Sequence, residues 1–476
     1  MKLDERKSVI GMILLVVLIL AIPQLIRYFY FDNALLGEVS YYNQRIAQDI
    51  LNGKNVSHDN LIFEGREYVF APYHYMLAYF SYFSGIELGS RLLPFMLGIL
   101  SFILFYYILK NTGFKLELRL IICSLTAISP AFIYGFTVSN KEAAFVFLFL
   151  LGLFLMVKEN RYLQNISWIP FAIIPFFGLF ETVLSVIGLF AVYLIYKRKG
   201  YALISIGIIA LVSLGYYIHF SYNYAPPEKI DFIDNNLLGG LLSDLGAKIG
   251  FSIFTVFLAL IGMIHSWKKK LRLASAYFVI LILLIGSYNI GGSINIYLNF
   301  VMGLFAGLSL YGLIKRKWDL NLVKYLTIFV IVCGIIFSVI SFVNVFIRSG
   351  PETNMIGALY FLERQEPGVV LSHYSNGFFI ETIANKETVM DSLLDSTRNA
   401  NQRYVDSKFI FLTRSLQDTK RMLKSYNVAY IFIDKSMKSG LVWEKEEQGL
   451  LFLFRNNETF KNIYRAKNAE VWEVIG

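Results

Sequence analysis

Cysteine and histidine are scarce in this sequence, and their scarcity excludes several kinds of site. The chain of 476 residues contains two cysteines, Cys123 and Cys333, and both lie inside apolar runs. A framework of disulfide bonds and a zinc site built from several cysteines are therefore excluded. The five histidines are scattered, without the short spacings that metal ligands show.

Charged residues are also few. They make up 16% of the chain, whereas hydrophobic residues make up 56% and the mean hydropathy is +0.55. Soluble domains carry about 25% charged residues, so this composition indicates a polytopic membrane protein whose first partner is the lipid bilayer. The net charge of +10 does not indicate a nucleic-acid partner, because the basic residues form short clusters between apolar runs. That distribution is the signal that orients membrane proteins.

The apolar runs predict a mainly α-helical core with about eleven membrane spans, since one span needs about 20 mostly apolar residues. The predicted spans are 8–26, 88–109, 118–135, 143–157, 166–180, 182–196, 201–218, 250–266, 272–290, 296–314 and 322–346. Pro170 and Pro175 interrupt the run 166–196, so we expect a short hairpin there, with Glu181 near the outer surface.

The basic residues predict the orientation of these spans. They gather at one set of alternate span ends, at 2–7, 110–119, 158–161, 197–199, 268–272 and 315–317. By the positive-inside rule this face is cytoplasmic. We therefore expect a multi-pass protein of the cell membrane, with a cytoplasmic N-terminus and an extracytoplasmic C-terminal domain.

The polar residues concentrate in the segments that this orientation places outside. Residues 1–348 form the predicted membrane domain, with outer loops at 27–87, 136–142 and 219–249. Residues 349–476 form a tail that is long enough for one small domain. The tail alternates predicted strands at 369–371, 388–390, 428–433 and 469–474 with predicted helices at 377–385, 415–426 and 444–455. This alternation predicts an α/β domain.

The first outer loop contains a predicted helix with polar residues on one face. The helix covers residues 37–51 and ends at Asn52-Gly53. Glu38, Tyr41 and Arg45 share a face at positions i, i+3 and i+7. At the start of the helix, Glu38 is well placed to act as a general base or to bind a hard cation. The alternative is a charge that stabilises the helix N-terminus and pairs with Arg45.

Several motifs follow one another in a recognisable order along the chain. They are Glu38 before Tyr41-Tyr42-Asn43-Gln44-Arg45, an aromatic helix led by Pro72 and expected in the outer interface, Ser129-Pro130 before Asn140-Lys141-Glu142, and Phe180-Glu181. Together they resemble the GT-C class of membrane glycosyltransferases, which includes oligosaccharyltransferase catalytic subunits and the protein-mannosyl and aminoarabinose transferases. Residues 372–378 fall where oligosaccharyltransferases carry their Trp-Trp-Asp-Tyr-Gly motif.

The resemblance implies an inverting glycosyltransferase that moves a sugar or glycan from a polyprenyl phosphate or diphosphate carrier. The acceptor would be a protein, a lipid or a polysaccharide at the extracytoplasmic face. The resemblance also implies roles for particular residues. Glu38 would be catalytic, and the substrate and its phosphate would be bound by Tyr41, Tyr42, Arg45, Arg66 and Glu181. Mg²⁺ or Mn²⁺ would be held by Asn140 and Glu142, and the acceptor side would contain His373 and Gly377.

The sequence departs from the class at three places. Val39 stands where oligosaccharyltransferases carry the first acid, and Asn140 replaces an acid in the second loop. The loop at 291–296, which includes Asn295, lacks the arginine that meets the lipid phosphate. These departures favour a transferase with weak or no metal dependence, whose positive charge comes from Arg45, Arg66, Lys229, Lys248 or Arg348. Two alternatives stay open, namely a non-catalytic scaffold with this fold and a transporter of a lipid-linked glycan.

Overall fold

The computed structural model describes residues 4–31, 34–195, 199–223, 237–267, 277, 279–286, 292–393, 397–445 and 447–475. Several predicted features lie outside the described residues, namely residues 224–236 of the outer loop 219–249 (with Lys229), most of the span 272–290, the whole basic cluster at 268–272 and part of the cluster at 197–199.

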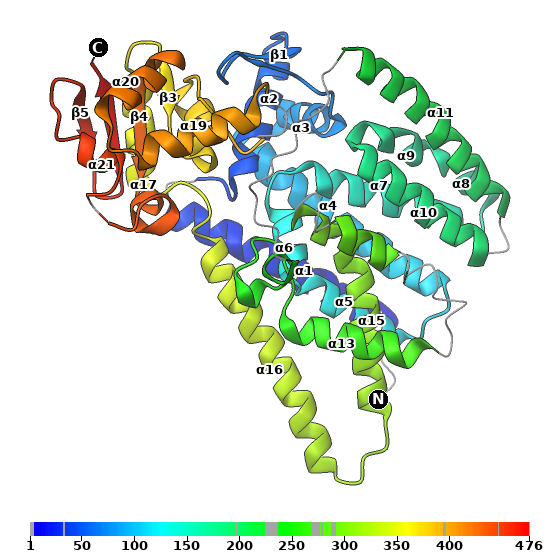
Figure 1. Cartoon of the computed structure of the whole chain (residues 1–476). Coiled ribbons are helices and arrows are strands. Elements are labelled where there is room, and N and C mark those ends of the chain that lie inside the picture. Colours follow the sequence, from blue (N-terminus) through cyan, green and yellow to red (C-terminus); the bar gives the residue numbers. More distant parts are fainter. Residues whose placement is uncertain are drawn as a thin grey trace.

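Helices make up the larger part of the molecule, and the C-terminal segment lies at one end of them (Figure 1). The helices of this bundle are α1 (Glu5–Tyr30), α4 (Ile86–Asn111), α5 (Leu116–Ala127), α6 (Pro130–Thr137), α7 (Lys141–Val157), α8 (Arg161–Asn165), α9 (Trp168–Ile173), η1 (Ile174–Phe177), α10 (Leu179–Ile195), α11 (Lys199–Asn223), α12 (Leu237–Leu241), η2 (Ser243–Leu245), α13 (Ile253–Ser266), η4 (Gly292–Ile294), α15 (Asn295–Lys315) and α16 (Asn321–Phe346).

Several of these helices can cross a membrane. Among the described residues, five helical segments are long and apolar enough, and a sixth is added if the bent pair α5 and α6 counts as one span. The expected multi-pass membrane architecture is thus confirmed, whereas the number of about eleven spans stays a prediction.

Proline breaks two of the predicted spans. Helices α5 and α6 meet at 64°, because Pro130 begins α6 and forces Ser129 into an extended conformation. The predicted span 118–135 is therefore bent. Pro175 lies in η1, and α10 begins only after Gly178, so the predicted break in the run 166–196 is present. Glu181 lies in the first turn of α10 and is buried among side chains, and its predicted place near the outer face of the membrane stays a prediction.

The first predicted outer loop folds into two helices joined by a small hairpin. They are α2 (Glu38–Leu51), the antiparallel strands β1 (His58–Asp59) and β2 (Arg66–Glu67), and α3 (Pro72–Ser84). The helices predicted at 37–51 and 72–83 are confirmed. Helix α3 keeps Tyr79, Tyr82 and Phe83 exposed, as a helix in a membrane interface would.

The tail is built on a four-stranded sheet. Its elements are α17 (Thr353–Glu363), β3 (Val369–Leu371), η5 (Tyr374–Asn376), α18 (Gly377–Phe379), η6 (Ile380–Ala384), α19 (Ala400–Leu412), α20 (Leu416–Ser425), β4 (Val428–Asp434), η8 (Met437–Leu441), α21 (Leu450–Leu453), β5 (Phe460–Arg465) and β6 (Ala469–Val474). The strand order is β3-β4-β6-β5, with β3 parallel to β4 and the other pairs antiparallel. Three of the predicted strands are confirmed, but at 388–390 only Thr388 forms isolated bridges, to Val370 and Ile62.

Both faces of this sheet are buried, because alternate residues of β4 point to opposite sides. Ile431 and Ile433 join a core with α19, α20 and α21. Tyr430 and Phe432 join a second core that contains α17, α18 and also Tyr41 of α2. The second face therefore packs against the first loop of the membrane domain.

Backbone contacts also join the tail to this loop. The N–H of Phe63 donates to the carbonyl of Thr388 at 2.8 Å, and the N–H of Thr388 donates to the carbonyl of Leu61 at 3.0 Å. Near the start of the tail, the buried guanidinium of Arg27 donates to the carbonyls of Ile347 and Pro351. The tail is thus fixed in position over α2.

Candidate active site

Glu38 begins helix α2 at a tight junction between two loops. Gly37, the residue before it, has a φ of +71°, and a Cβ atom there would lie 3.1 Å from the side chain of Val138. Glycine is needed here for two reasons. Other residues rarely adopt this backbone conformation, and the Val138 side chain fills the space that a Cβ atom would need. The first residue of α2 is therefore held close to the second predicted outer loop.

Hydrogen bonds fix α2 against this second loop. The N–H of Ser139 donates to Oγ of Ser40 at 2.9 Å, and Nδ2 of Asn43 donates to the carbonyl of Ser139 at 2.8 Å. The hydroxyls of Tyr73 and Ser139 lie 2.7 Å apart. All four side chains are buried, so Glu38 is attached to a rigid junction.

The Glu38 carboxylate faces groups from three other segments. Nζ of Lys248, between η2 and α13, lies 3.5 Å from its Oε1. Tyr134 of α6 and Tyr374 of the tail both lie within electrostatic reach of the carboxylate. Segments far apart in the sequence thus converge on the partly exposed Glu38. The alternative pairing of Glu38 with Arg45 is wrong, because Arg45 binds other carboxylates.

A second acidic group, which consists of Glu142 and Glu181, lies beside this junction of Glu38 with the second loop. Glu142, in the first turn of α7, is close enough to Glu181 for the two carboxylates to repel each other. The Tyr297 hydroxyl of α15 donates to Glu181 at 3.0 Å. Nζ of Lys141 donates to the carbonyl of Phe177 at 3.0 Å and brings a positive charge next to Glu142. Glu181 therefore contributes an acid buried among these groups, and its neighbours suit a hydroxyl or a proton better than a phosphate.

Asn140, one of the two residues predicted to bind a divalent cation, is engaged in another role. Oδ1 of Asn140 accepts from the N–H of Ala143 at 2.8 Å and caps α7, and its Nδ2 donates to the carbonyl of Gly135 at 3.1 Å. The ammonium group beside Glu38 would repel a cation. Within the described ranges there is no cluster of three or more His, Cys, Asp or Glu residues that could hold a metal ion.

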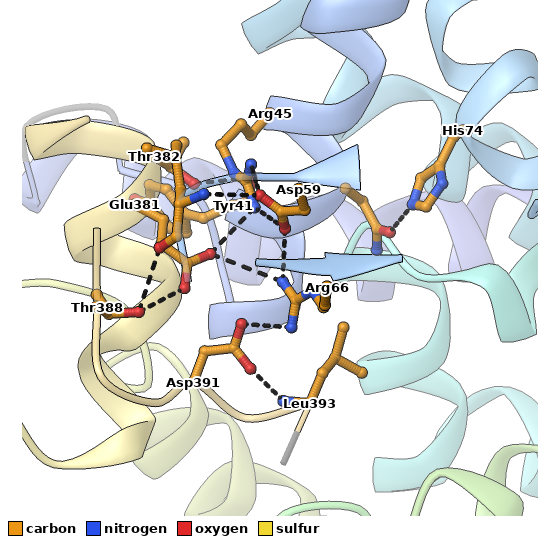
Figure 2. A network of polar contacts seen from close by, with 12 residues as sticks. Tyr41, Arg45, Asp59, Arg66, His74, Glu381, Thr382, Thr388, Asp391 and Leu393 are labelled. Atoms are coloured by element: carbon orange, nitrogen blue, oxygen red, sulfur yellow. Dashed lines mark hydrogen bonds and ion pairs between the residues drawn. The ribbon is translucent and has the colours of Figure 1, made fainter. Parts of the chain in front are cut away.

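Arg45 and Arg66 belong to a buried ionic network, which Figure 2 shows. Both guanidinium groups donate to Asp59 at 2.8 Å. Arg45 also donates to Glu381 at 3.0 Å, and Arg66 lies 2.6 Å from Asp391. Side-chain exposure is 10% for Arg45 and 3% or less for the other four. The structure therefore gives the two arginines a different role from the predicted phosphate binding, since carboxylates already occupy them.

The network contains one more carboxylate than guanidinium groups, and its pKa values reflect this excess. Burial acts to raise the pKa of Asp59, but hydrogen bonds and charges from Arg45 and Arg66 outweigh it and hold that pKa below its usual range. Burial and then repulsion by Asp391 raise the pKa of Glu381 to about 8, against the attraction of Arg45. A protonated Glu381 leaves the network electrically neutral.

We expect the thermal stability to depend on pH through Glu381. The folded protein keeps a proton that the unfolded chain releases at its ordinary pKa of 4.5. The stabilising contribution is complete at acidic pH and is lost as the pH rises towards about 8, with a slope of at most about 1.4 kcal/mol per pH unit. Glu381→Gln should therefore flatten the curve of melting temperature against pH, whereas the exposed Asp418→Asn should leave it unchanged. Parallel curves for the wild type and Glu381→Gln would contradict this assignment.

Tyr41, Tyr42 and Gly377 hold the tail in place. The Tyr41 hydroxyl accepts from the N–H of Leu35 at 3.0 Å, and its ring packs edge-on against Phe379. The Tyr42 ring lies against Phe378 and under the guanidinium of Arg66. A Cβ atom on Gly377 would lie 2.6 Å from the backbone of Asp391, so only glycine allows this approach. The structure thus gives these residues packing roles, and the predicted substrate contacts of Tyr41 and Tyr42 and the acceptor-side place of Gly377 stay predictions.

His373 lies within electrostatic reach of Lys248, the ion-pair partner of Glu38. Burial lowers the pKa of His373 to about 4, against the attraction of Asp434 and with a smaller contribution from the charge of Lys248. The imidazole is therefore neutral at pH 7 and is close to the residue that pairs with Glu38. Of the two predicted acceptor-side residues, the structure brings His373 to the junction.

An apolar cavity of about 200 Å³ lies next to the second acidic group. Side chains from α7, α10 and α15 line it, among them Phe149, Leu184 and Tyr297. Tyr297 is the residue that donates to Glu181. The cavity therefore joins an apolar space inside the bundle to a polar group near the junction.

Some residues of the site were not predicted from the sequence. Glu381 follows the apolar run Phe378-Phe379-Ile380, and a charge inside a buried helix signals a buried partner. Tyr134 and Tyr297 give no such signal, because tyrosine is frequent in membrane helices. Lys248 was one of five candidate cations, and its position beside Glu38 required the structure.

Comparison with known proteins adds a fold-level result. No protein-family model and no curated protein sequence matches the chain. The oligosaccharyltransferase of Archaeoglobus fulgidus in complex with Zn and sulfate matches with a TM-score of 0.65 and 14% identity, over 98% of this chain and 73% of that one. Its complex with an inhibitory peptide and a dolichol-phosphate matches with a TM-score of 0.62 and 13% identity, over 90% and 69%.

A bacterial structure matches over nearly the full length of both chains. ArnT from Cupriavidus metallidurans bound to undecaprenyl phosphate has a TM-score of 0.51 and 11% identity, over 96% of this chain and 97% of that one. At such low identity the likeness concerns the fold. The chain therefore has the fold of GT-C glycosyltransferases, as its sequence motifs predicted.

Proposed function

We propose that this protein is a membrane glycosyltransferase that moves a sugar or glycan from a polyprenyl phosphate or diphosphate carrier to an acceptor at the extracytoplasmic face. The observation that carries the proposal is the convergence of Glu38, Lys248 and Tyr374 from three separate segments. In the same fold, A. fulgidus AglB has been solved with a dolichol-phosphate and ArnT with undecaprenyl phosphate.

The apolar cavity supports a lipid-linked donor. Its lining of phenylalanine, leucine and valine side chains suits the prenyl units of a carrier, which gain free energy on leaving water. Tyr297, which lines the cavity and donates to Glu181, would then lie near the sugar end of the donor. A soluble nucleotide sugar has no part that would fill this cavity.

The proposed reaction needs a base and a counter-charge. Glu38 takes the proton from the acceptor hydroxyl or amide as the acceptor atom attacks the anomeric carbon of the donor sugar. The bond from that carbon to the carrier phosphate oxygen breaks, and the phosphate leaves with the bonding electrons. Attack opposite to the leaving phosphate inverts the anomeric configuration. The Lys248 ammonium stabilises the negative charge on the leaving phosphate.

We propose that this transfer is independent of a divalent cation. Asn140 is engaged as a helix cap, and Lys248 holds a positive charge beside Glu38. Arg45 and Arg66 are neutralised by carboxylates, so Lys248, beside Glu38, is better placed than either arginine to meet the carrier phosphate. An ammonium group interacts with phosphate as a point charge and needs no fixed coordination geometry.

The test of this function uses the purified full chain in lipid nanodiscs. Polyprenyl phosphates that carry different labelled sugars are offered together with a membrane and cell-wall extract, and transfer of the label is followed by mass spectrometry. Transfer with release of free carrier phosphate supports the proposal. Tight binding of the carrier without turnover, across all donors, would favour the alternative of a non-catalytic scaffold.

Replacement of Lys248 should show whether it supplies the counter-charge. We expect Lys248→Ala to lower the transfer rate by about 10²-fold, the effect of removing one stabilising charge, and Lys248→Arg to keep most of it. Chelation with EDTA should change neither rate. Lys420→Ala, which removes an exposed lysine of α20 in the tail, is the matched control. Full activity of Lys248→Ala, or loss of wild-type activity in EDTA, would remove Lys248 from this role.

A further inference from the structure

Lys248 lies in a short segment whose two ends are joined by the backbone. The N–H of Phe251 donates to the carbonyl of Leu241 at 2.8 Å. A Cβ atom on Gly250 would lie 2.7 Å from the same carbonyl oxygen, so glycine is what allows the two ends to approach so closely. Residues 241–251 therefore form a closed loop, which we call the Lys248 loop.

Asn295, at the start of α15, holds the backbone near both ends of this loop. Its Nδ2 donates to the carbonyl of Gly240 at 2.9 Å and to the carbonyl of Ile249 at 2.6 Å. Gly240 lies in the last turn of α12, where carbonyls lack partners within the helix. Asn295 is fully buried, and a buried carbonyl without a partner costs free energy. One side chain thus fixes the backbone before the loop and directly after Lys248.

Asp244 fastens the Lys248 loop to two further helices. Its Oδ2 accepts from the N–H of Ile253, the first residue of α13, at 2.7 Å. Its Oδ1 accepts from the hydroxyl of Ser338 in α16, the helix that leads into the tail. The loop is therefore bound to α13, α15 and α16 at once.

The Lys248 side chain depends on this fixed backbone for its position. It is 79% exposed, whereas the Glu38 side chain with which it pairs is 20% exposed. A lysine side chain has many rotamers, and little of the protein surrounds this one, so its backbone determines where the ammonium group can reach. The 3.5 Å between Nζ of Lys248 and Oε1 of Glu38 thus depends on the bonds that hold the loop.

We propose that Asn295 is a positioning residue of the transfer reaction and that it acts through Lys248. By holding the Lys248 loop, it keeps the ammonium group beside Glu38, where the carrier phosphate would meet it. Without Asn295 the loop would have to be ordered each time a phosphate binds, and that ordering would weaken binding. The inference rests on the proposed function for the role of Lys248, but phosphate binding can be measured without any transfer.

The first test measures the motion of the loop in the full chain in nanodiscs. A nitroxide label is attached through Leu245→Cys, because Leu245 belongs to the loop and is exposed. Cys333→Ser removes the exposed natural cysteine, whereas Cys123 is buried and stays. We expect a narrower electron paramagnetic resonance spectrum for Asn295→Ala than for the labelled parent protein, because the label moves with a looser backbone.

The second test is a double-mutant cycle with geranyl phosphate, a short soluble carrier, as the probe. Lys248→Ala should raise the Kd by about 10-fold, the effect of losing a charged hydrogen bond. Asn295→Ala should raise the Kd by about 3- to 5-fold, because the loop must then be ordered on binding. In the Lys248→Ala background, Asn295→Ala should have no further effect on the Kd. A residue that only stabilised the fold would have the same effect in both backgrounds.

Asn299→Ala is the matched control. Asn299 lies one turn further along α15, is 1% exposed, and donates through Nδ2 to the carbonyl of Thr126 at 3.0 Å. Its replacement should lower the melting temperature, as that of Asn295 does, but should change neither the label spectrum nor the Kd.

Asp244→Ala provides a second variant for the case that Asn295→Ala does not fold. Asp244 is exposed, so its replacement should be tolerated. It should also narrow the label spectrum and raise the Kd for geranyl phosphate, and the effect on the Kd should again disappear in the Lys248→Ala background.

The outcomes separate this proposal from the proposed function. Equal label spectra for Asn295→Ala and Asn299→Ala, or effects of Asn295→Ala and Lys248→Ala on the Kd that simply add, would overturn the positioning role even if transfer depends on Lys248. A loosened loop whose effect on the Kd requires Lys248, in a protein that transfers no sugar from any donor, would support the holding of Lys248 by Asn295 and overturn the proposed function.

Discussion

Replacing Glu38 by glutamine should lower the transfer rate by about 10²- to 10⁴-fold, the range that a general base contributes. The amide has the same shape but cannot take a proton from the acceptor. Glu38 is partly exposed and its only ion-pair partner in the described part of the chain is Lys248, so the fold should survive. The measurement compares initial rates of sugar transfer in nanodiscs, together with melting temperatures of the two proteins.

The same substitution can be tested in cells without knowledge of the substrate. The gene is deleted, and lipid-linked sugars and surface glycans are compared by mass spectrometry after rescue with the wild type or with Glu38→Gln. We expect one surface sugar to disappear while its carrier accumulates, with rescue by the wild type alone. Glu67→Gln, an exposed carboxylate in the same loop, should rescue fully. Full rescue by Glu38→Gln would mean that the base lies elsewhere or that the chain is a scaffold.

Replacing Arg66 by methionine should destabilise the protein by about 3–5 kcal/mol, the usual cost of leaving a buried charge without its partner. Arg66 binds both Asp59 and Asp391, and all three side chains are 3% exposed or less. Methionine fills much of the space but leaves the buried Asp391 without its guanidinium partner, while Asp59 keeps Arg45. The melting temperature in detergent, measured by intrinsic fluorescence, reports the loss.

Two further variants decide whether the charge causes this loss. Arg421→Met removes an exposed arginine that pairs with Asp418, and such surface pairs contribute about 0–1 kcal/mol. The double variant Arg66→Met with Asp391→Asn should be less destabilised than the sum of the two single variants, because the second change removes the unpaired charge. A melting temperature for Arg66→Met equal to that of Arg421→Met would show that the network adds little stability.

The helical architecture and most of the tail could be predicted from the sequence, because their signals are local. The stripe on α2, the proline before α3 and the alternation in β4 and β6 each depend on residues within one element. The strand β5 was missed, since its polar residues at 461, 462 and 465 hide the pattern. The bend between α5 and α6 was also missed, although Pro130 marks it.

The site was harder to predict, because its contacts join residues far apart in the chain. Arg45 and Glu381 are separated by 336 positions, and no local pattern shows that they meet. The motif resemblance brought Asn140 to attention, but the structure uses its side chain to cap a helix. Glu38 is the predicted residue whose surroundings agree best with a chemical role, since its carboxylate remains partly exposed at a junction of loops.

The order in which the chain is synthesised determines when the ionic network can assemble. Arg45, Asp59 and Arg66 are made early, long before Glu381 and Asp391. Until then the two arginines have a single carboxylate between them, and the loop lacks the Thr388 bridge to Ile62. Completion of the tail therefore completes the loop that carries Glu38. A chain truncated before residue 381 would reach the membrane with its spans in place and its reaction centre unassembled.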